Sequence, residues 1–226
     1  MNSEMDDKER RLAVASALAT EHFVLQTAMS TTVNEGGSRA SIYIFALSSS
    51  LVALGFSTQS PEAFLPFVGI VLPALFLLGV FTVLRLVDIA AESMQFHIGI
   101  ARIRKFYRTF SPDAELHFAA DRGRWPEAKA EPALWAGPLI GYLTTLASMI
   151  AFVNAVVAGA GVTLLAHQLL AWSISLALGI GMACAATFLV LFFFYQLHRI
   201  SELVKSWEEP KDFQQQVRLN AQWRPR

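Results

Sequence analysis

The order of hydrophobic and polar residues divides this chain into long apolar runs separated by charged segments. The longest run, residues 132–197, contains no Asp, Glu, Lys or Arg. A helix rises about 1.5 Å per residue and crosses a bilayer with about 20 apolar residues, so this run is too long for one span. The pattern therefore predicts two spans, at about 138–161 and 171–196, with a short turn at 162–170.

The first half of the chain predicts a second pair of spans. Residues 40–56 are uncharged, and residues 63–84 form an apolar run that contains Pro66 and Pro73. Pro66 falls in the first helical turn, where its missing N–H costs little. Pro73 lies in the middle of the run and predicts a kink there.

The helical pattern continues beyond two of the apolar runs. Past residue 84, polar and apolar residues keep to separate sides of one helix as far as about residue 110. Within it, Arg85 and Asp88 are spaced to pair as the helix leaves the membrane. The fourth span likewise continues as a helix past residue 196.

The beginning of the chain predicts a separate helix. Residues 3–34 place Val14, Leu18, Leu25 and Met29 on one side. The pair Gly36–Gly37 should then break or bend the chain. We expect this helix to pack on the helices that continue past the second and fourth spans.

These elements predict an all-α membrane protein with four transmembrane helices, in which spans 2 and 4 are prolonged into cytoplasmic helices. The expected segments are a cytoplasmic amphipathic helix, a first transmembrane hairpin, a cytoplasmic helix and loop, a second transmembrane hairpin, and a cytoplasmic helix and tail. Their bounds are residues 1–39, 40–84, 85–136, 137–197 and 198–226.

The positions of the basic residues predict which side is inside. All 18 Lys and Arg residues lie in 1–39, 85–129 and 199–226, and the two short turns have none. Cytoplasmic loops of membrane proteins carry the excess of Lys and Arg. We therefore expect a multi-pass protein of the bacterial inner (plasma) membrane with the N- and C-termini in the cytoplasm.

Composition and motifs narrow the function classes. Hydrophobic residues make up 54% of the chain and the net charge is +0, which gives no bias toward nucleic acid. The single cysteine, Cys184, permits no internal disulfide, and metal sites need several ligands. Motifs such as HExxH, GxSxG and the P-loop are missing, so we expect no enzyme, no cofactor and no metal. The span interiors lack ionisable groups, which disfavours a proton-coupled transporter.

Small residues recur at every fourth position on the last two spans. In lipid, such rows allow helix backbones to approach closely. They fit either a tightly packed hairpin or a subunit interface, and the spacing does not separate these alternatives. The rows are Ala147, Ala151, Ala155 and Gly159, and Ser173, Ala177, Gly181 and Ala185.

The candidate polar contacts are few. Ser48, Ser49 and Ser50 lie in the first span and Asn154 lies in the third. Such groups either bond to neighbouring helices or line a pore, and packing is the favoured interpretation. Four basic residues form a candidate patch for a cytoplasmic ligand or partner, although a solvated face near lipid headgroups is the simpler interpretation. They are Arg102, Arg104, Lys105 and Arg108.

Residues 35–56, from Glu35-Gly-Gly-Ser-Arg-Ala-Ser to Leu-Val-Ala-Leu-Gly-Phe56, resemble the start of the first span in uncharacterised bacterial four-span inner-membrane proteins. That resemblance implies no activity. In architecture alone, the chain is similar to small membrane effectors of bacterial defence systems, in which spans are joined to cytoplasmic helices.

The leading hypothesis is a self-associating membrane protein that acts as a channel or membrane-perturbing effector, controlled through its cytoplasmic helices by a protein or small-molecule signal. One alternative is a non-catalytic accessory or scaffold subunit of a larger membrane complex. Another is a small-solute transporter. The expected partners are the lipid bilayer and either further copies of the chain or a membrane-complex subunit.

Overall fold

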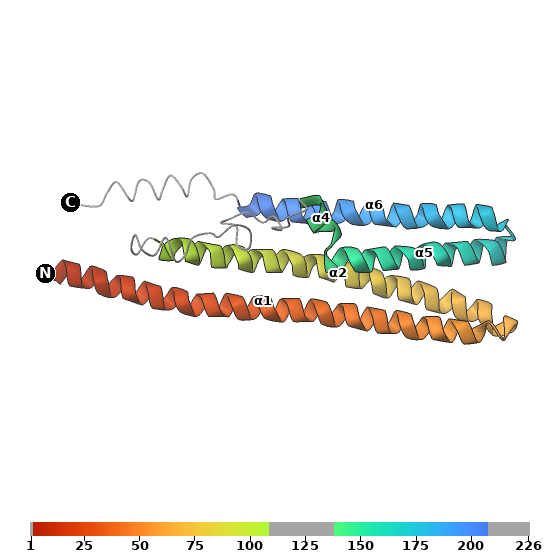
Figure 1. Ribbon diagram of the computed structural model, residues 1–226, viewed down its shortest axis with the longest axis horizontal. Helices are drawn as coiled ribbons and strands as arrows, with labels where there is room; N and C mark the ends of the chain where they lie inside the picture. Colours follow the sequence, from red (N-terminus) through yellow and green to blue (C-terminus); the bar gives the residue numbers. More distant parts are fainter. Residues whose placement is uncertain (1, 109–137, 208–226) are drawn as a thin grey trace.

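The computed structural model describes residues 2–108 and 138–207, whose regular structure is entirely α-helical. Two long hairpins lie side by side, with both hairpin turns at the same end of the molecule (Figure 1). The first hairpin joins α1 to α2, and the second joins α5 to α6 after the short helix α4. The bounds are α1 Asn2–Ser57, α2 Pro61–Tyr107, α4 Pro138–Leu143, α5 Leu146–Leu170 and α6 Ile174–Trp207.

Four of the described helices, α1, α2, α5 and α6, are long and apolar enough to cross a membrane. This confirms the predicted all-α class and fits a multi-pass membrane protein. A span needs about 20 residues, whereas α1 has 56 and α2 has 47. The extra turns of both helices project together at the end opposite the hairpin turns (Figure 1).

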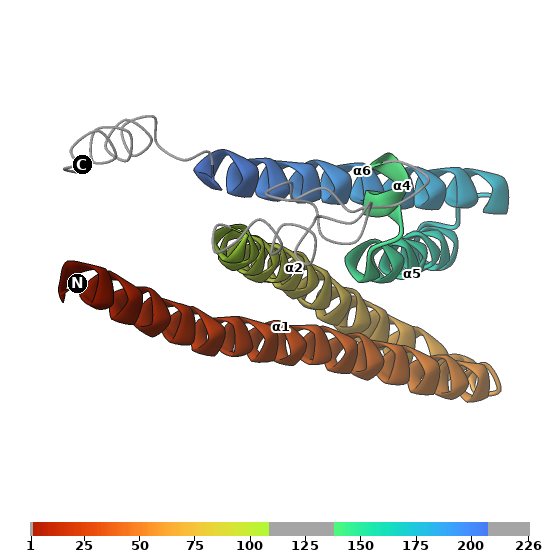
Figure 2. The same ribbon diagram turned by 60° about the vertical axis from the view of Figure 1, so that its left-hand side comes forward.

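The helices form an open array instead of a closed bundle. The sequence of packing partners is α1 on α2, α2 on α5 and α5 on α6. The outer helices are therefore α1 and α6, as Figure 2 shows. The core cluster lies where the two hairpins meet, and it comprises Ala40, Tyr43, Val83, Leu86, Val87, Ile89, Ala147, Ile150, Ala151 and Phe192.

The projecting part of α1 packs on the projecting part of α2, as expected, but the expected packing of α1 on the continuation of the fourth span, α6, is not found among the described residues. A Cβ atom on Gly99 of α2 would lie 2.9 Å from Leu25 Cδ1 of α1, which shows how close the helices are. Nearer the free ends, the Tyr107 hydroxyl donates to the Ala15 carbonyl at 3.4 Å. Together these contacts hold the two projections side by side as a helical pair.

The predicted break at Gly36–Gly37 is wrong, because α1 continues through it. Gly36 is buried against α2, where an added Cβ would lie 3.4 Å from Ile89 Cγ2. The Arg39 side chain bonds to Glu35 one turn earlier and so bridges the glycine pair. The absent side chain of Gly36 allows close helix packing, which offsets the flexibility that glycine brings.

The predicted third span, a continuous helix over 138–161, is also wrong in its bounds. The chain leaves the helical conformation at Thr145, with φ −68° and ψ 153°, and the Thr145 hydroxyl accepts from the Ser148 N–H as an N-cap. Helix α5 then runs on to Leu170, so the short turn lies at 171–173 and not over 162–170.

Two other predictions about helix length are confirmed. Helix α2 runs through Pro66 and Pro73 and continues past the apolar run to Tyr107. Helix α6 continues past the fourth span to Trp207. The predicted loop after residue 110 and the predicted tail after residue 207 lie outside the described residues.

Candidate functional site

A group of four charged residues joins α1 to α2 where the apolar parts of both helices begin. We call Glu35, Arg39, Arg85 and Glu92 the ionic node. Arg85 donates from Nε to Glu35 Oε1 at 3.0 Å and from Nη2 to Oε2 at 2.9 Å. Its Nη1 donates to Glu92 Oε1 at 2.8 Å. Bidentate arginine–carboxylate pairs fix orientation more firmly than single bonds.

The ionic node changes the pKa values of its members. The hydrogen bonds from Arg85 and Arg39 lower the pKa of Glu35 from 4.5 to about 2. The bonds to Glu35 and Glu92 in turn raise the pKa of Arg85. About a third of each of the Arg85 and Glu35 side chains is exposed, so water screens their attraction. The node therefore sets the register of α1 on α2 more than it stabilises the fold.

A second ion pair joins the two hairpins close to the ionic node, three residues along α2 from Arg85. Arg199 of α6 donates from Nε to Asp88 Oδ1 of α2 at 3.1 Å. The predicted pair between Arg85 and Asp88 is therefore wrong. Arg85 turns toward α1 and Asp88 toward α6, since each finds an oppositely charged partner on a neighbouring helix.

Asn154 links three helices within the apolar part of the molecule. Its side chain is fully buried. The Tyr43 hydroxyl of α1 donates to Asn154 Oδ1 at 3.2 Å, and Asn154 Nδ2 donates to the Phe76 carbonyl of α2 at 3.3 Å. Gly79 makes room for the amide, because a Cβ at that position would collide with Asn154 Oδ1. Within one copy, Asn154 thus bonds between helices.

A polar cluster lies at the interruption between α4 and α5, and the sequence did not predict it. Gln196 of α6 is 2% exposed and donates from Nε2 to Thr145 Oγ1 at 3.2 Å. Ser148 is 5% exposed, and its hydroxyl donates to the Tyr142 carbonyl at 2.7 Å. The sequence did contain a signal for this cluster. It places three hydroxyl residues close together in the third span and one glutamine at a matching depth in the fourth. They are Thr144, Thr145, Ser148 and Gln196. Gln196, Thr145 and Ser148 bond to one another, whereas Thr144 is exposed and donates to the Ile140 carbonyl of its own helix.

The three candidate serines point in different directions. Ser48 and Ser49 are exposed on α1, and the Ser49 hydroxyl donates to the Phe45 carbonyl of its own helix. Ser50 lines a small apolar pocket between α1 and α2 together with Leu54 and Leu72. Ser48 and Ser49 are therefore open to the surroundings of α1, whereas Ser50 faces α2.

The two rows of small residues meet at one close crossing of α5 and α6. A Cβ on Gly159 would lie 2.8 Å from the Gly181 carbonyl oxygen and 3.1 Å from the Ala185 Cβ. Ala177 is fully buried, whereas Ser173 is exposed before the start of α6. The remaining members, Ala147, Ala151 and Ala155, are buried toward the core. Within one copy, then, both rows form helix contacts.

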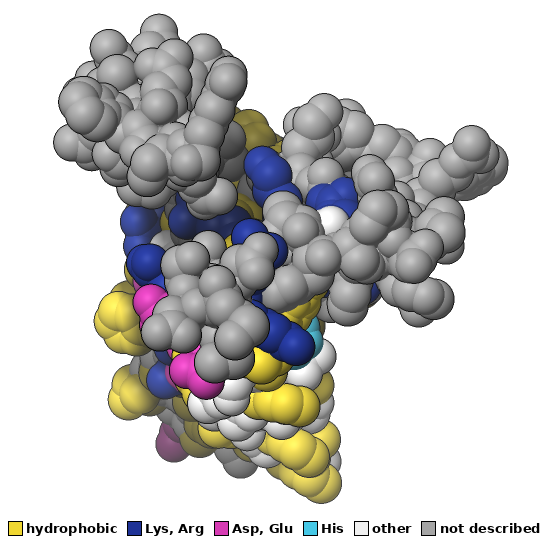
Figure 3. Space-filling model, turned by 90° about the vertical axis from the view of Figure 1, so that its left-hand side faces the viewer, with side chains coloured by type: hydrophobic (Ala, Val, Ile, Leu, Met, Phe, Trp, Pro, Cys, Tyr) yellow, Lys and Arg dark blue, Asp and Glu magenta, His cyan; other side chains and the backbone are white. Residues whose placement is uncertain are grey.

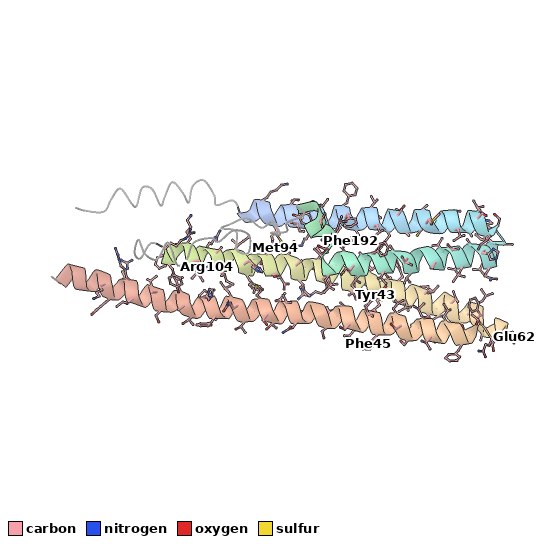
Figure 4. All side chains as sticks on the ribbon, viewed as in Figure 1. Tyr43, Phe45, Glu62, Met94, Arg104 and Phe192 are labelled. Atoms are coloured by element: carbon pink, nitrogen blue, oxygen red, sulfur yellow. The ribbon has the colours of Figure 1, made fainter. Side chains whose placement is uncertain are left out.

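The basic residues of the described chain gather at the projecting end, which Figure 3 views directly. One of these residues, Arg104 of α2, is labelled in Figure 4. Arg102, Arg104 and Arg108 all take part in interactions, and Lys105 is exposed. The predicted ligand patch stays a prediction. In the ranges 2–108 and 138–207, no group of three His, Cys, Asp or Glu side chains could hold a metal ion.

Comparison of the chain with models of protein families, with curated proteins and with solved structures finds no match. The resemblance over residues 35–56 thus stays a prediction. The function must be inferred from the arrangement itself. That arrangement consists of two helices that join an apolar half to a charged half, with a node of ion pairs at the junction.

Proposed function

We propose that this chain is a self-associating protein of the bacterial inner membrane, which acts as a channel or membrane-perturbing effector. In this proposal both termini and the projecting helices lie in the cytoplasm, where a protein or small molecule acts on them. The proposed orientation rests on the basic residues, which all lie on one side of the spans in the sequence.

The observation that carries the proposal is the continuity of α1 and α2. Each helix passes from a membrane-length apolar segment into its projection without interruption. The ionic node joins the two helices at that junction. A displacement of the projecting pair is therefore transmitted to the spans, because a continuous helix moves as a rigid element.

Conduction in this proposal takes place between copies. Asn154 and Gln196 are buried and hydrogen-bonded within one chain, so neither faces an open path. Ser48 is exposed on the outer helix α1 and is the candidate pore residue that a neighbouring copy would approach.

Planar-bilayer recording of the purified full chain tests the proposal. We expect discrete conductance steps, and we expect Arg85→Gln to change the open probability by weakening the link between projection and span. Arg10→Gln is the matched control, because it removes an exposed arginine of α1 far from the node. A monomeric protein that conducts under no condition and leaves vesicles intact would contradict the proposal.

An accessory subunit of a larger complex is the second candidate. The observation that favours it is the open array, which leaves the outer faces of α1 and α6 for a partner helix. This alternative predicts a stoichiometric partner after solubilisation in mild detergent and no conductance from the chain alone. A small-solute transporter is less favoured, since the polar cluster around Gln196 is satisfied by its own hydrogen bonds.

A further inference from the structure

The turn between α5 and α6 is surrounded by large apolar side chains that are open to the surroundings. Leu169 and Leu170 end α5, Trp172 lies in the turn, and Ile174 begins α6. We call these four residues the α5–α6 tip. Each of them has 36–65% of its surface exposed, so the described chain leaves the tip open.

The other hairpin turn, between α1 and α2, lies at the same end of the molecule and is polar (Figure 1). Thr58, Gln59 and Ser60 are exposed there, and Glu62 adds an exposed carboxylate in the first turn of α2. Water suits this turn, because an ionised carboxylate is costly to transfer into lipid. The two turns therefore reach the same end with opposite side-chain chemistry.

The main chain of the α5–α6 turn is bonded by nearby residues of the same hairpin. Ala171 adopts the left-handed conformation, with φ 53°, and its N–H donates to the Ala166 carbonyl. The Trp172 N–H donates to the same carbonyl at 3.5 Å. The Trp172 carbonyl accepts from Nδ1 of His167 at 2.8 Å. Main-chain groups in lipid must find such partners inside the protein, because no water is present to bond them.

Ser173 extends this bonding to the start of α6. Its hydroxyl accepts from the Leu176 N–H at 3.4 Å, and its carbonyl accepts from the Ala177 N–H at 3.0 Å. The start of a helix leaves N–H groups without partners, and a capping side chain bonds one of them. Ser60, which precedes α2, makes no such side-chain bond. At this point the α5–α6 turn meets a requirement for lipid that the α1–α2 turn does not.

We propose that the α5–α6 tip binds lipid, at the boundary between headgroups and acyl chains, while the α1–α2 turn beside it lies in water. Helices α5 and α6 are both long and apolar enough to cross a membrane, and residues 132–197 contain no Asp, Glu, Lys or Arg. Tryptophan favours this boundary, because its ring is apolar and its N–H is polar. The exposed side chains of His167 and Gln168 lie next to the tip and suit the headgroups.

This placement makes the lipid surface uneven around the molecule. Both turns reach the same end (Figure 1), so acyl chains extend further along the second hairpin than along the first. A bilayer changes its thickness locally to match the apolar length of a protein. The second hairpin therefore deforms the leaflet on its own side, which deepens the membrane-perturbing version of the proposed function.

Fluorescence quenching of the full chain, in vesicles of phosphatidylcholine and phosphatidylglycerol, tests the lipid contact. In a Cys184→Ser parent, Ala171→Cys carries an environment-sensitive thiol dye in the α5–α6 turn. Gln59→Cys is the matched control, because it is exposed in the α1–α2 turn. Ile70→Cys, exposed in the membrane-length part of α2, is the reference for a position in lipid. The quencher is a phosphatidylcholine that carries a nitroxide near the headgroup end of one acyl chain.

We expect the nitroxide to quench the Ala171→Cys dye severalfold more strongly than the Gln59→Cys dye. The emission of the Ala171→Cys dye should also shift toward that of the Ile70→Cys dye. Both turns lie at one end, so the comparison does not depend on which way the chain inserts. Equal or stronger quenching at Gln59→Cys would overturn the proposal. So would a blue-shifted Ala171→Cys dye that lipid does not quench, since a protein partner would then cover the tip.

The native indole gives a second measurement, which needs no dye. In a chain whose other tryptophans are replaced by phenylalanine, Trp172 is the sole source of indole emission. We expect brominated phosphatidylcholine to remove most of this emission. Emission that brominated lipid leaves unchanged would also overturn the proposal.

This inference rests on the membrane location in the proposed function, and not on self-association or conduction. Flotation of the vesicles after an alkaline wash separates the two failures. Protein that leaves the vesicles would overturn the membrane location and the lipid contact together. Protein that stays in the vesicles with an unquenched Ala171→Cys dye would overturn only the lipid contact.

Discussion

Arg85 of α2 binds both carboxylate oxygens of Glu35, a residue of α1 that lies fifty positions earlier in the chain. The same guanidinium also binds Glu92, which lies about two turns further along the same side of α2. Arg85 thus uses two of its nitrogens to hold α1 in register on α2, and the third bonds within α2. It does so beside the buried Gly36, where the two helices come close enough for Ile89 to contact the glycine.

The stability of the first hairpin should depend on pH through Glu35. Its pKa is lowered from 4.5 to about 2 in the folded chain, so the charged carboxylate favours folding. This contribution is complete above pH 4.5 and is lost as the pH falls toward 2, since the unfolded chain takes up the proton first. The thermal midpoint of the parent should exceed that of Glu35→Gln at neutral pH, and the two should converge over this interval.

Thermal unfolding in detergent, recorded by circular dichroism from pH 7 to acid, measures the difference. Glu62→Gln is the control, because Glu62 lies in the first turn of α2, at the hairpin turn (Figure 4) and more than twenty residues along that helix from Arg85. The prediction fails if Glu35→Gln and Glu62→Gln follow the same curve at every pH.

Gly79→Ala should destabilise the contact between the hairpins. The new methyl group would collide with the Asn154 amide, which is held by Tyr43 and Phe76 on either side. Overpacking of this kind costs about 1–3 kcal/mol. Because the obstacle is a side chain, the cost should largely disappear in an Asn154→Ala background, which itself loses about 0.6–1.7 kcal/mol of interhelical bonding.

A double-mutant cycle on the full chain, unfolded by SDS in mixed micelles, measures this coupling. Gly69→Ala is the matched control on the same helix, since nothing lies within 4 Å of the space its methyl group would fill. Additive losses for Gly79→Ala and Asn154→Ala would rule out the predicted collision between the new methyl group and the Asn154 amide.

Gly181→Ala should weaken the α5–α6 hairpin, and removal of one neighbouring side chain should not rescue it. The methyl group would meet the Thr163 hydroxyl and also the Gly159 carbonyl oxygen, which belongs to the backbone. We expect a loss of about 1–3 kcal/mol. It should persist in a Thr163→Ala background, in contrast to the rescue expected at Gly79.

Gly179→Ala provides the control two residues earlier, because that position of α6 has open space. The same SDS titration applies to both variants. Equal stability of Gly179→Ala and Gly181→Ala would show that the close crossing at Gly159 is not present in the folded chain.

The apolar runs were sufficient to predict the four long helices, because length and hydropathy alone decide whether a helix can cross a bilayer. The continuation of α2 to Tyr107 was also predictable, since its apolar side keeps the helical period beyond the span. These are properties of single segments, and they need no knowledge of which helix lies beside which.

The errors arise where a neighbouring helix changes a local preference. Gly36–Gly37 looked like a break, but α2 packs into the space that Gly36 leaves. Thr145 looked like the interior of a span, but its hydroxyl caps α5 and accepts a bond from Gln196 of α6. Arg85 and Asp88 looked like partners, but each pairs with an oppositely charged residue on another helix. Sequence spacing within one segment carries no information about these pairings.

The side of the membrane on which the projecting helices lie is the most direct prediction to check. In a Cys184→Ser parent, a cysteine at Gln59 tests the α1–α2 turn, and one at Lys105 tests the projecting end of α2. Both positions are exposed. Because Lys and Arg mark the cytoplasmic side, we expect a membrane-impermeant thiol reagent to label Gln59→Cys in outer-membrane-permeabilised cells and to label Lys105→Cys only after lysis. The reverse order of labelling would place the projecting helices outside the cytoplasm, and the proposed control of the spans by a cytoplasmic signal would then be wrong.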